Sequence, residues 1–313
     1  MSKILGIDIG GTNTKIASVD DSGKTGPVIS LPTSAQSGLD DYLEAITRAA
    51  REILTQESSI TGVGIGVAGF IDAHHTTMTF NPNISWLEGI NLCTHFSSTL
   101  NLPVTLEVDS NAAALAEYVY GNDKECKRLL VLTVGTGLGG GMIVEGEVLR
   151  IANECLGDIG HVIVEPGGFQ CNSGCHGCAE AMACAPALER YYAQSNSPKG
   201  TLPEPGQSVF SDKIRTLEII AAAQQGDQAA KTAIQKIGGY LGIALASIAP
   251  ILSPDCICLA GGVSEAGLEL LEATESSFKK FAGLPYWKDV KVHKAKLGWQ
   301  SVLIGATVAH QRT

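Results

Sequence analysis

A strand that runs into a turn of Gly and Thr occurs twice in this chain of 313 residues, and it constrains the fold more than any other feature. The copies are Leu5-Gly-Ile-Asp-Ile-Gly-Gly-Thr12 and Val131-Leu-Thr-Val-Gly-Thr-Gly137. Each heads one half of the chain, and a second apolar strand follows each turn, as in a tight hairpin. The spacing between the two copies is too long for the repeat of a solenoid. A single hydrophobic core stops growing at roughly 250–300 residues. The pattern therefore predicts two related lobes.

Strands alternate with helices along the chain, which predicts the α/β class. Expected strands cover residues 3–9, 14–19, 62–69, 104–108, 129–134 and 257–260. Expected helices cover 39–57, 112–120, 238–249 and 302–310, with Gly121 and Pro250 ending the second and third. Residues 195–208 have the composition of a loop. The uncharged stretch 237–254 favours a packed helix over a membrane span, because it is rich in Gly and contains two prolines.

The formal net charge of −10 argues against a nucleic-acid partner, which needs a basic face. It leaves small phosphates open, because backbone N–H groups and a metal ion can hold them. Nine cysteines are an odd number, and six are scattered. Without a secretory signal, these six are expected to be reduced thiols in a cytoplasmic protein with no membrane association.

The first hairpin, Asp8-Ile-Gly-Gly-Thr-Asn-Thr-Lys15, is a strand–turn–strand and so differs from a Walker loop, which opens a helix. Gly10 and Gly11 would let the backbone approach an anion, Thr12 adds a hydroxyl, and Asp8 is suited to Mg²⁺. The alternative is a hairpin that simply needs glycines. The second hairpin favours a nucleotide site, because two such loops can hold one polyphosphate between two lobes.

Asp109 follows an apolar strand and precedes an Ala-rich helix. One interpretation makes it the N-cap of that helix, a position that Asp favours. The other places its carboxylate where open α/β sheets bind ligands, ready to accept a proton from a substrate hydroxyl.

A metal site is predicted from His161 and the cluster Cys171-x3-Cys175-x2-Cys178. Three thiolates and an imidazole match a closed, tetrahedral and structural zinc site. The loop between the cysteines is polar and rich in turn residues, so packing does not explain the spacing. His176 is an alternative ligand to one of the cysteines.

Eight motifs, in order and nearly end to end, resemble the ROK group (repressors, open reading frames, kinases) of the actin and hexokinase superfamily. They are Asp8-Ile-Gly-Gly-Thr-Asn13, Gly64-Ile-Gly-Val-Ala-Gly69, Asn81-Pro-Asn-Ile-Ser-Trp86, Asp109-Ser-Asn-Ala-Ala-Ala-Leu-Ala-Glu117, Leu132-Thr-Val-Gly-Thr-Gly-Leu-Gly-Gly-Gly141, Gly157-Asp-Ile-Gly-His161, the cysteine segment ending at Glu180, and Leu259-Ala-Gly-Gly-Val-Ser264. One motif alone is weak evidence, whereas eight in the family order are specific.

The resemblance implies a two-lobed, actin-like ATPase fold of the ribonuclease H type with a cleft between the lobes. One lobe would be residues 1–121 with a C-terminal helix at about 299–313, and the other 122–298 with the zinc loop. It implies an ATP-dependent sugar kinase, glucokinase-like, that uses Mg²⁺ and contains structural Zn²⁺. A homodimer is expected from the family.

The resemblance also implies residue roles. Asp109 is the expected catalytic base. Sugar would be bound by Gly69, Asn83, Asp109, Asp158, His161 and Glu180. ATP and its phosphates would be bound by Asp8, Gly10, Gly11, Thr12, Asn13, Lys15, Thr133, Gly135, Thr136, Gly137, Gly261 and Gly262. His161 would contact sugar through one ring nitrogen and zinc, with Cys171, Cys175 and Cys178, through the other.

Three departures from the family pattern fall inside the expected sugar site. Val108 replaces an Asn, Asp158 replaces a Glu, and Ser173 replaces the middle cysteine of the zinc motif, whose place Cys175 is expected to take. The phosphate motifs and Asp109 are unchanged. The reaction is therefore the firmer expectation, and the sugar need not be glucose.

Two other functions compete with a kinase. A sugar-responsive repressor of this group would carry a helix-turn-helix domain before the first phosphate motif, which here begins at Lys3. A sugar-binding protein with weak or no kinase activity is the second, suggested by Val108 and Asp158. The phosphate donor is also open between ATP and polyphosphate.

Overall fold

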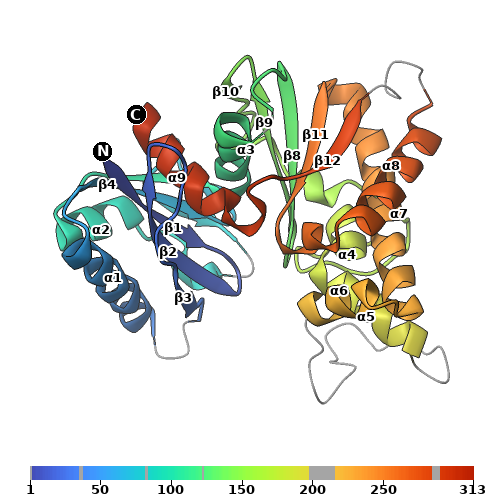
Figure 1. Cartoon of the computed structure of the whole chain (residues 1–313), viewed down its shortest axis with the longest axis horizontal. Coiled ribbons are helices and arrows are strands. Elements are labelled where there is room, and N and C mark those ends of the chain that lie inside the picture. The colour runs from blue at the N-terminus through green and yellow to red at the C-terminus, as the bar shows by residue number, and fades with distance from the viewer. Residues whose placement is uncertain (1, 35–37, 82–83, 122, 197–215, 284–289) are drawn as a thin grey trace. The chain divides into compact units, whose positions relative to one another are not determined.

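The computed structural model describes residues 2–34, 38–81, 84–121, 123–196, 216–283 and 290–313. The chain divides into two compact units (Figure 1). Unit 1 comprises Met1–Lys127, Gly141–Gly157 and Gln300–Thr313, and unit 2 comprises Arg128–Gly140 and Asp158–Trp299. The lobe boundaries expected from the family resemblance stay a prediction.

Unit 1 contains a five-stranded sheet with the order β3-β2-β1-β4-β7. Its strands are β1 (Lys3–Ile9), β2 (Asn13–Asp20), β3 (Ile29–Pro32), β4 (Ile60–Val67) and β7 (Val104–Val108). The first three form an antiparallel meander, and β1, β4 and β7 run parallel. The small pair β5 (Phe70–Ile71) and β6 (Met78–Phe80) follows β4.

The alternation of Gly with β-branched residues in β4 reflects different packing on its two faces. Val63, Ile65 and Val67 are fully buried in the core that the sheet forms with α1 (Leu39–Gln56) and α2 (Leu92–Leu100). On the other face, α9 (Ser301–Arg312) lies so close that a Cβ on Gly64 would be 2.1 Å from the carbonyl oxygen of Ala306. The glycines therefore let the C-terminal helix pack against the strand (Figure 1).

Replacing Gly64 by Ala is expected to lower the free energy of unfolding by about 3 kcal/mol or more, because backbone must move to admit the methyl group. Gly239 in α7 is the matched control, since nothing lies within 4 Å of a Cβ there. There Ala is expected to stabilise the protein by about 0.4–1 kcal/mol. Thermal unfolding of both variants tests this, and equal stabilities would refute the close approach of α9.

A second five-stranded sheet has the order β10-β9-β8-β11-β12. Its strands are β8 (Arg128–Val134), β9 (Leu138–Val144), β10 (Glu147–Val148), β11 (Cys256–Ala260) and β12 (Lys291–Lys294). In both sheets the first strand of the hairpin, β1 or β8, has its hairpin partner and a third, antiparallel strand on one side. Two parallel strands lie on its other side. The predicted internal repeat is thus confirmed. The second turn is shorter than expected, because residues 138–141 already belong to β9.

The remaining helices are α3 (Asp109–Tyr120), α4 (Ala179–Ala183), α5 (Ala185–Asn196), α6 (Thr216–Gln224), α7 (Gln228–Leu252) and α8 (Leu268–Ala282). Short 3-10 segments are η1 (Ser85–Leu87), η2 (Ile159–His161), η3 (Gly262–Ala266) and η5 (Gly298–Gln300). Within unit 2, α7 and α8 pack so closely that a Cβ on Gly242 would lie 2.4 Å from that of Ser277.

The expectation that Pro250 ends a helix begun at Gly238 is wrong. Helix α7 begins at Gln228 and includes Pro250 in its last turn, ending at Leu252 with Ser253 in the left-handed conformation. This helix is long and apolar enough to cross a membrane by length and composition alone, but half of its most apolar window is buried in the protein. Core helices commonly have this character.

Two further expectations have mixed outcomes. Cys93, Cys155, Cys184 and Cys258 are buried free thiols, as predicted for the scattered cysteines. That interpretation is wrong for Cys126 and Cys256, which are disulfide-bonded. The loop expected at 195–208 lies outside the described residues from position 197 onward.

Candidate functional site

The carboxyl ends of β1, β4 and β7 lie at one edge of the unit 1 sheet. In the ladder, Ile9 pairs with Val67 and Val67 pairs with Val108. The next positions along each strand are Gly10, Ala68 with Gly69, and Asp109. Open α/β sheets bind ligands beyond this edge, and the predicted residues of unit 1 gather there.

Asp109 is the first residue of α3, and the strand passes into the helix without a loop. The N-cap is Val108, so the interpretation of Asp109 as the N-cap is wrong. Its Oδ1 atom accepts a hydrogen bond of 2.6 Å from the N–H of Ser110. A helix N-terminus favours a negative charge, and this bond fixes the carboxylate at the strand–helix junction.

The electrostatic setting makes Asp109 an unusual carboxylate. Burial raises its pKa to about 7, the nearby negative charge of Asp8 raises it too, and the bond from Ser110 lowers it. A carboxyl group with a pKa near neutrality can accept a proton and release it again at physiological pH. Perturbed groups of this kind concentrate at functional sites.

The first hairpin turn is closed by a bond of 3.2 Å from the N–H of Gly10 to the carbonyl of Asn13. Thr12 and Asn13 are exposed, and Gly10 and Gly11 are half-buried. Lys15 pairs with buried Asp8, with Nζ at 3.3 Å from Oδ2. Burial raises the pKa of Asp8 and the ammonium of Lys15 opposes this, so one cation and one buried carboxylate lie beside the turn.

Gly69 has a φ of 105°, and a Cβ there would lie 2.4 Å from the carbonyl oxygen of Phe80. Only glycine fits this position. Of the other predicted sugar-binding residues before Asp109, Asn83 lies outside the described residues. Val108 is buried in the unit 1 core and offers no polar group to a ligand.

In unit 2, the second hairpin turn lies at the carboxyl end of β8. Gly135 donates its N–H to the carbonyl of Gly137, and the exposed Thr136 lies between them. A Cβ on Gly261 would meet the carbonyl oxygen of Val134 at 2.5 Å, so the turn after β11 lies against the end of β8. The predicted phosphate and adenosine segments of this unit are therefore adjacent, with half-buried Thr133 in β8 and Gly262 beginning η3.

Glu180, in the first turn of α4, contacts the same turn. Its Oε2 accepts a bond of 3.0 Å from the N–H of Leu138, and a Cβ on Gly137 would be only 2.5 Å from that oxygen. The glycine at 137 is therefore needed for the carboxylate to approach. Glu180 fixes the shape of the second hairpin turn, a contact that sequence reasoning did not anticipate.

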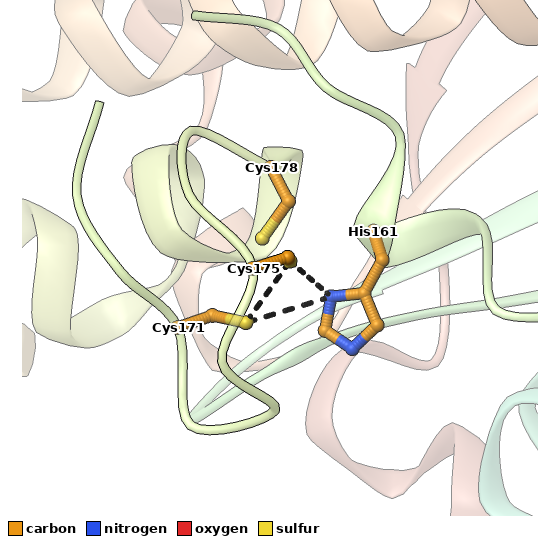
Figure 2. Close-up of side chains that lie close together, drawn as sticks. All are labelled: His161, Cys171, Cys175 and Cys178. Carbon is orange, nitrogen blue, oxygen red and sulfur yellow. Dashed lines mark hydrogen bonds between the residues drawn. The ribbon is translucent and has the colours of Figure 1, made fainter. Parts of the chain in front are cut away.

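The predicted metal ligands lie together in unit 2 (Figure 2). One donor atom from each of His161, Cys171, Cys175 and Cys178 lies within 4.8 Å of all the others. The His161 Nδ1 atom is 3.9 Å from the sulfur of Cys171 and 3.7 Å from that of Cys175, and these sulfurs are 3.2 Å apart. A zinc tetrahedron with Zn–S bonds of about 2.3 Å has sulfur–sulfur edges of roughly 3.8 Å. Donor set and spacing fit zinc, and His176 is not a member.

The two ring nitrogens of His161 face different groups. Nδ1 points at the sulfurs, whereas Nε2 lies 3.1 Å from the hydroxyl oxygen of Ser173 and 3.3 Å from Oδ2 of Asp158. Two of the three positions that depart from the family pattern thus contact the nitrogen that faces away from the metal ligands. The Asp158 side chain is about half exposed, so it is accessible to a ligand.

Sequence reasoning overlooked the charged residues beside Asp109. Glu107 is almost fully buried at the end of β7 and forms an ion pair with Arg150, with Oε2 at 2.6 Å from Nη2. The available signal was a carboxylate between two apolar residues of a strand, Leu106 and Val108, where a charge requires a buried partner. The partner itself is 43 residues away in the chain.

Comparisons with known proteins agree with this fold and arrangement. The sequence pattern described as the ROK family matches residues 4–312. The chain is 31% identical to the glucokinase of Streptomyces coelicolor, covering 98% of this chain and 96% of that protein. It is 32% identical to the glucokinase of Halalkalibacterium halodurans, covering 96% and 92%.

Among solved structures, the ROK family glucokinase of Streptomyces griseus, in complex with glucose and AMPPNP, superposes with a TM-score of 0.89. That pair is 30% identical, and the match covers 100% of both chains. The expected kinase class and the two-lobed, actin-like kinase fold are thereby confirmed. The chain belongs to the ROK family and is a carbohydrate kinase that phosphorylates a sugar.

Proposed function

We propose that this carbohydrate kinase transfers the γ-phosphate of ATP to a hydroxyl of a hexose or a closely related sugar, with Asp109 as the catalytic base. The observation that carries the proposal is the position of the Asp109 carboxylate, at the carboxyl edge of the parallel strands where open α/β sheets bind ligands, together with its pKa of about 7. A base with this pKa is ionised in a large fraction of molecules at neutral pH and binds the proton it removes.

In the proposed mechanism, Asp109 accepts the proton of the sugar hydroxyl as its oxygen attacks the γ-phosphorus. The bond between that phosphorus and the β–γ bridging oxygen breaks, and ADP leaves with the electron pair. Phosphoryl transfer depends mainly on positioning and charge neutralisation. The fixed geometry of Asp109 at the start of α3 supplies the positioning.

Nucleotide binding is assigned to the two hairpins and the turn after β11. In unit 1 the N–H groups near Gly10, Gly11, Thr12 and Asn13 would contact phosphate oxygens, and Lys15 would add a cation. In unit 2 the same role falls to Thr133, Gly135, Thr136 and Gly137, with Gly261 and Gly262 beside the adenosine. Asp8 would hold Mg²⁺, which neutralises phosphate charge when bound.

Sugar binding is assigned to Gly69, Asn83, Asp109, Asp158, His161 and Glu180. The Nε2 atom of His161 and the exposed carboxylate of Asp158 form a neighbouring donor and acceptor, as a sugar hydroxyl requires. Asp is one methylene shorter than the family's Glu. Because of this difference, a hydroxyl that Glu would bond directly needs a water bridge here.

A structural zinc ion is proposed to be bound by His161 Nδ1 and the thiolates of Cys171, Cys175 and Cys178. With Nδ1 on the metal, Nε2 carries the proton and is a hydrogen-bond donor. The zinc ligands would thereby fix both the orientation and the tautomer of a sugar-binding residue. Cytoplasmic location, a homodimer and the absence of nucleic-acid and membrane partners remain part of this proposal.

A coupled assay of ADP release with a panel of hexoses tests the function. At least one hexose is expected to raise the rate at least tenfold above the rate with ATP alone. The Asp158→Glu variant, which restores the family carboxylate, is expected to lower the KM for glucose several-fold, because the direct bond is regained.

Two outcomes would contradict the proposal. If ATP binds but no hexose of the panel stimulates turnover, the assignment of a hexose or a close relative as the acceptor is wrong. If inorganic polyphosphate supports turnover and ATP does not, the assignment of the donor is wrong. The Asp109→Asn variant measured in parallel supplies the background rate.

A further inference from the structure

Asp109 is flanked by a network of polar contacts that its own chemistry does not require. The Glu107 network consists of Glu107, Asn111, Arg150, Glu154 and His75, all within unit 1. Glu107 lies two residues before Asp109 in the chain, and Asn111 lies two residues after it. The others come from distant parts of the chain.

The Glu107 carboxylate is the centre of the network and accepts hydrogen bonds with both of its oxygens. Its Oε1 accepts bonds from the N–H of Val108 at 2.9 Å, from Asn111 Nδ2 at 3.0 Å and from Arg150 Nη1 at 3.0 Å. Its Oε2 accepts a bond of 2.6 Å from Arg150 Nη2. Two parallel bonds from one guanidinium are strong and strictly oriented.

These bonds fix the backbone on both sides of Asp109. Val108 is held from the strand side through its N–H. On the helix side, the Asn111 amide spans Glu107 and the carbonyl of Glu154, the latter at 2.8 Å. The last strand residue and the first helical turn are thus tied to residues 150–154, leaving Asp109 little freedom to move.

The segment that holds the junction, residues 150–154, contains strained backbone conformations. Asn153 and Glu154 have φ values of 51° and 60°, in a turn closed by a bond from the N–H of Cys155 to the carbonyl of Ala152. His75 has a φ of 55°, and its Nε2 lies 3.0 Å from Oε2 of Glu154. Non-glycine residues rarely adopt this left-handed region, because it is sterically strained for them. Such strain persists where the surrounding structure holds a site in shape.

We propose that Arg150 and Glu107 are positioning residues for the catalytic base, in which the buried ion pair holds the β7–α3 junction so that the Asp109 carboxylate points at the sugar hydroxyl. The proposal rests on the proposed function, because it assumes that Asp109 is the base. It assigns no contact with substrate to either residue. A misplacement of about 1 Å in a reacting group can lower the rate by about 100-fold.

The test uses the Arg150→Lys variant of the full chain. Lys keeps the positive charge but cannot form both bonds to Glu107. The expected result is a kcat lowered by about 10–100-fold, with the KM values for ATP and sugar within about twofold of wild type. Glu107→Gln is the second variant, with the same expected result, in case the first does not fold.

Arg312→Lys is the matched control. Arg312 donates from Nη1 to the carbonyl of Gly146 at 2.7 Å, in the same unit and against the β9–β10 hairpin, away from Asp109 in the chain. Its kcat is expected to equal that of wild type. If Arg150→Lys or Glu107→Gln has the same kcat as this control, the positioning role is refuted. It is also refuted if kcat falls only by the fraction of the variant that is unfolded.

A double-mutant cycle separates this proposal from the assignment of the base. In the Asp109→Asn background, Arg150→Lys is expected to cause no further loss of the residual rate, because it acts through Asp109. An additional 10-fold loss there would overturn the positioning role while leaving Asp109 as the base. If Asp109→Asn is itself active, the proposed function fails first.

Discussion

Replacing Asp109 by Asn is expected to lower kcat by about 10³-fold, the size of effect typical of a general base. The amide has the shape of the carboxylate and can still accept the N–H bond from Ser110, but it cannot take the proton of the sugar hydroxyl. ATP binding is expected to be nearly unchanged, because the proposed phosphate-binding groups lie on the hairpins. Steady-state kinetics with the best sugar, together with ATP titration by calorimetry, measures both quantities.

The same variant has a stability signature that depends on pH. The folded-state pKa of Asp109, about 7, is above its ordinary value of 3.8, so the folded protein binds more protons between these values. The stability of the wild type therefore falls as pH rises through this window, and the penalty is complete above about pH 7. Asn carries no charge and avoids it.

The Tm of Asp109→Asn is therefore expected to exceed that of wild type at pH 8, and the difference is expected to vanish near pH 4. Such a trade of stability for activity is common at catalytic residues. Activity that survives in Asp109→Asn would show that another group is the base. A variant that is inactive but less stable than wild type at pH 8 would show that Asp109 is a structural residue.

Loss of one zinc ligand is expected to have the second large effect. Cys175→Ser should lower bound zinc from about one ion per chain to near zero, because Ser is a poor ligand for zinc. Losing about 3 kcal/mol of metal-dependent stability would lower the Tm by about 6–12 °C in units of this size. Metal analysis of the purified protein and thermal unfolding measure the two effects.

The choice of Cys175 distinguishes this chain from the family pattern, where the middle cysteine stands at the position of Ser173. His176→Ala is the matched control, since His176 neighbours Cys175 in the loop but lies outside the ligand cluster. It is expected to retain zinc. Chelation should lower the Tm of wild type to that of Cys175→Ser and leave the variant unchanged. A purified wild-type protein without zinc, and with a Tm indifferent to chelation, would contradict the site.

The sequence by itself determined the elements whose signals are local. The two Gly/Thr turns predicted the hairpins β1–β2 and β8–β9, and the repetition of their pattern predicted the repeated sheet. The cysteine spacing with His161 predicted the cluster, because ligands in one short loop cannot move far apart. Asp109 was identified at the end of an apolar strand, where parallel sheets bind ligands.

Only the tertiary structure decided how distant residues act together. The burial that raises the pKa of Asp109 depends on the packing around it, so the sequence left open whether this residue was an N-cap or a base. The partner of Glu107 is Arg150, and no local pattern connects residues 43 positions apart. The alternation of Gly with β-branched residues predicted the strand β4. That the glycines allow the close approach of α9 followed only from the packing of the folded chain. Local periodicity determines secondary structure, whereas the pKa and orientation of a catalytic group depend on contacts between residues that are far apart in the chain.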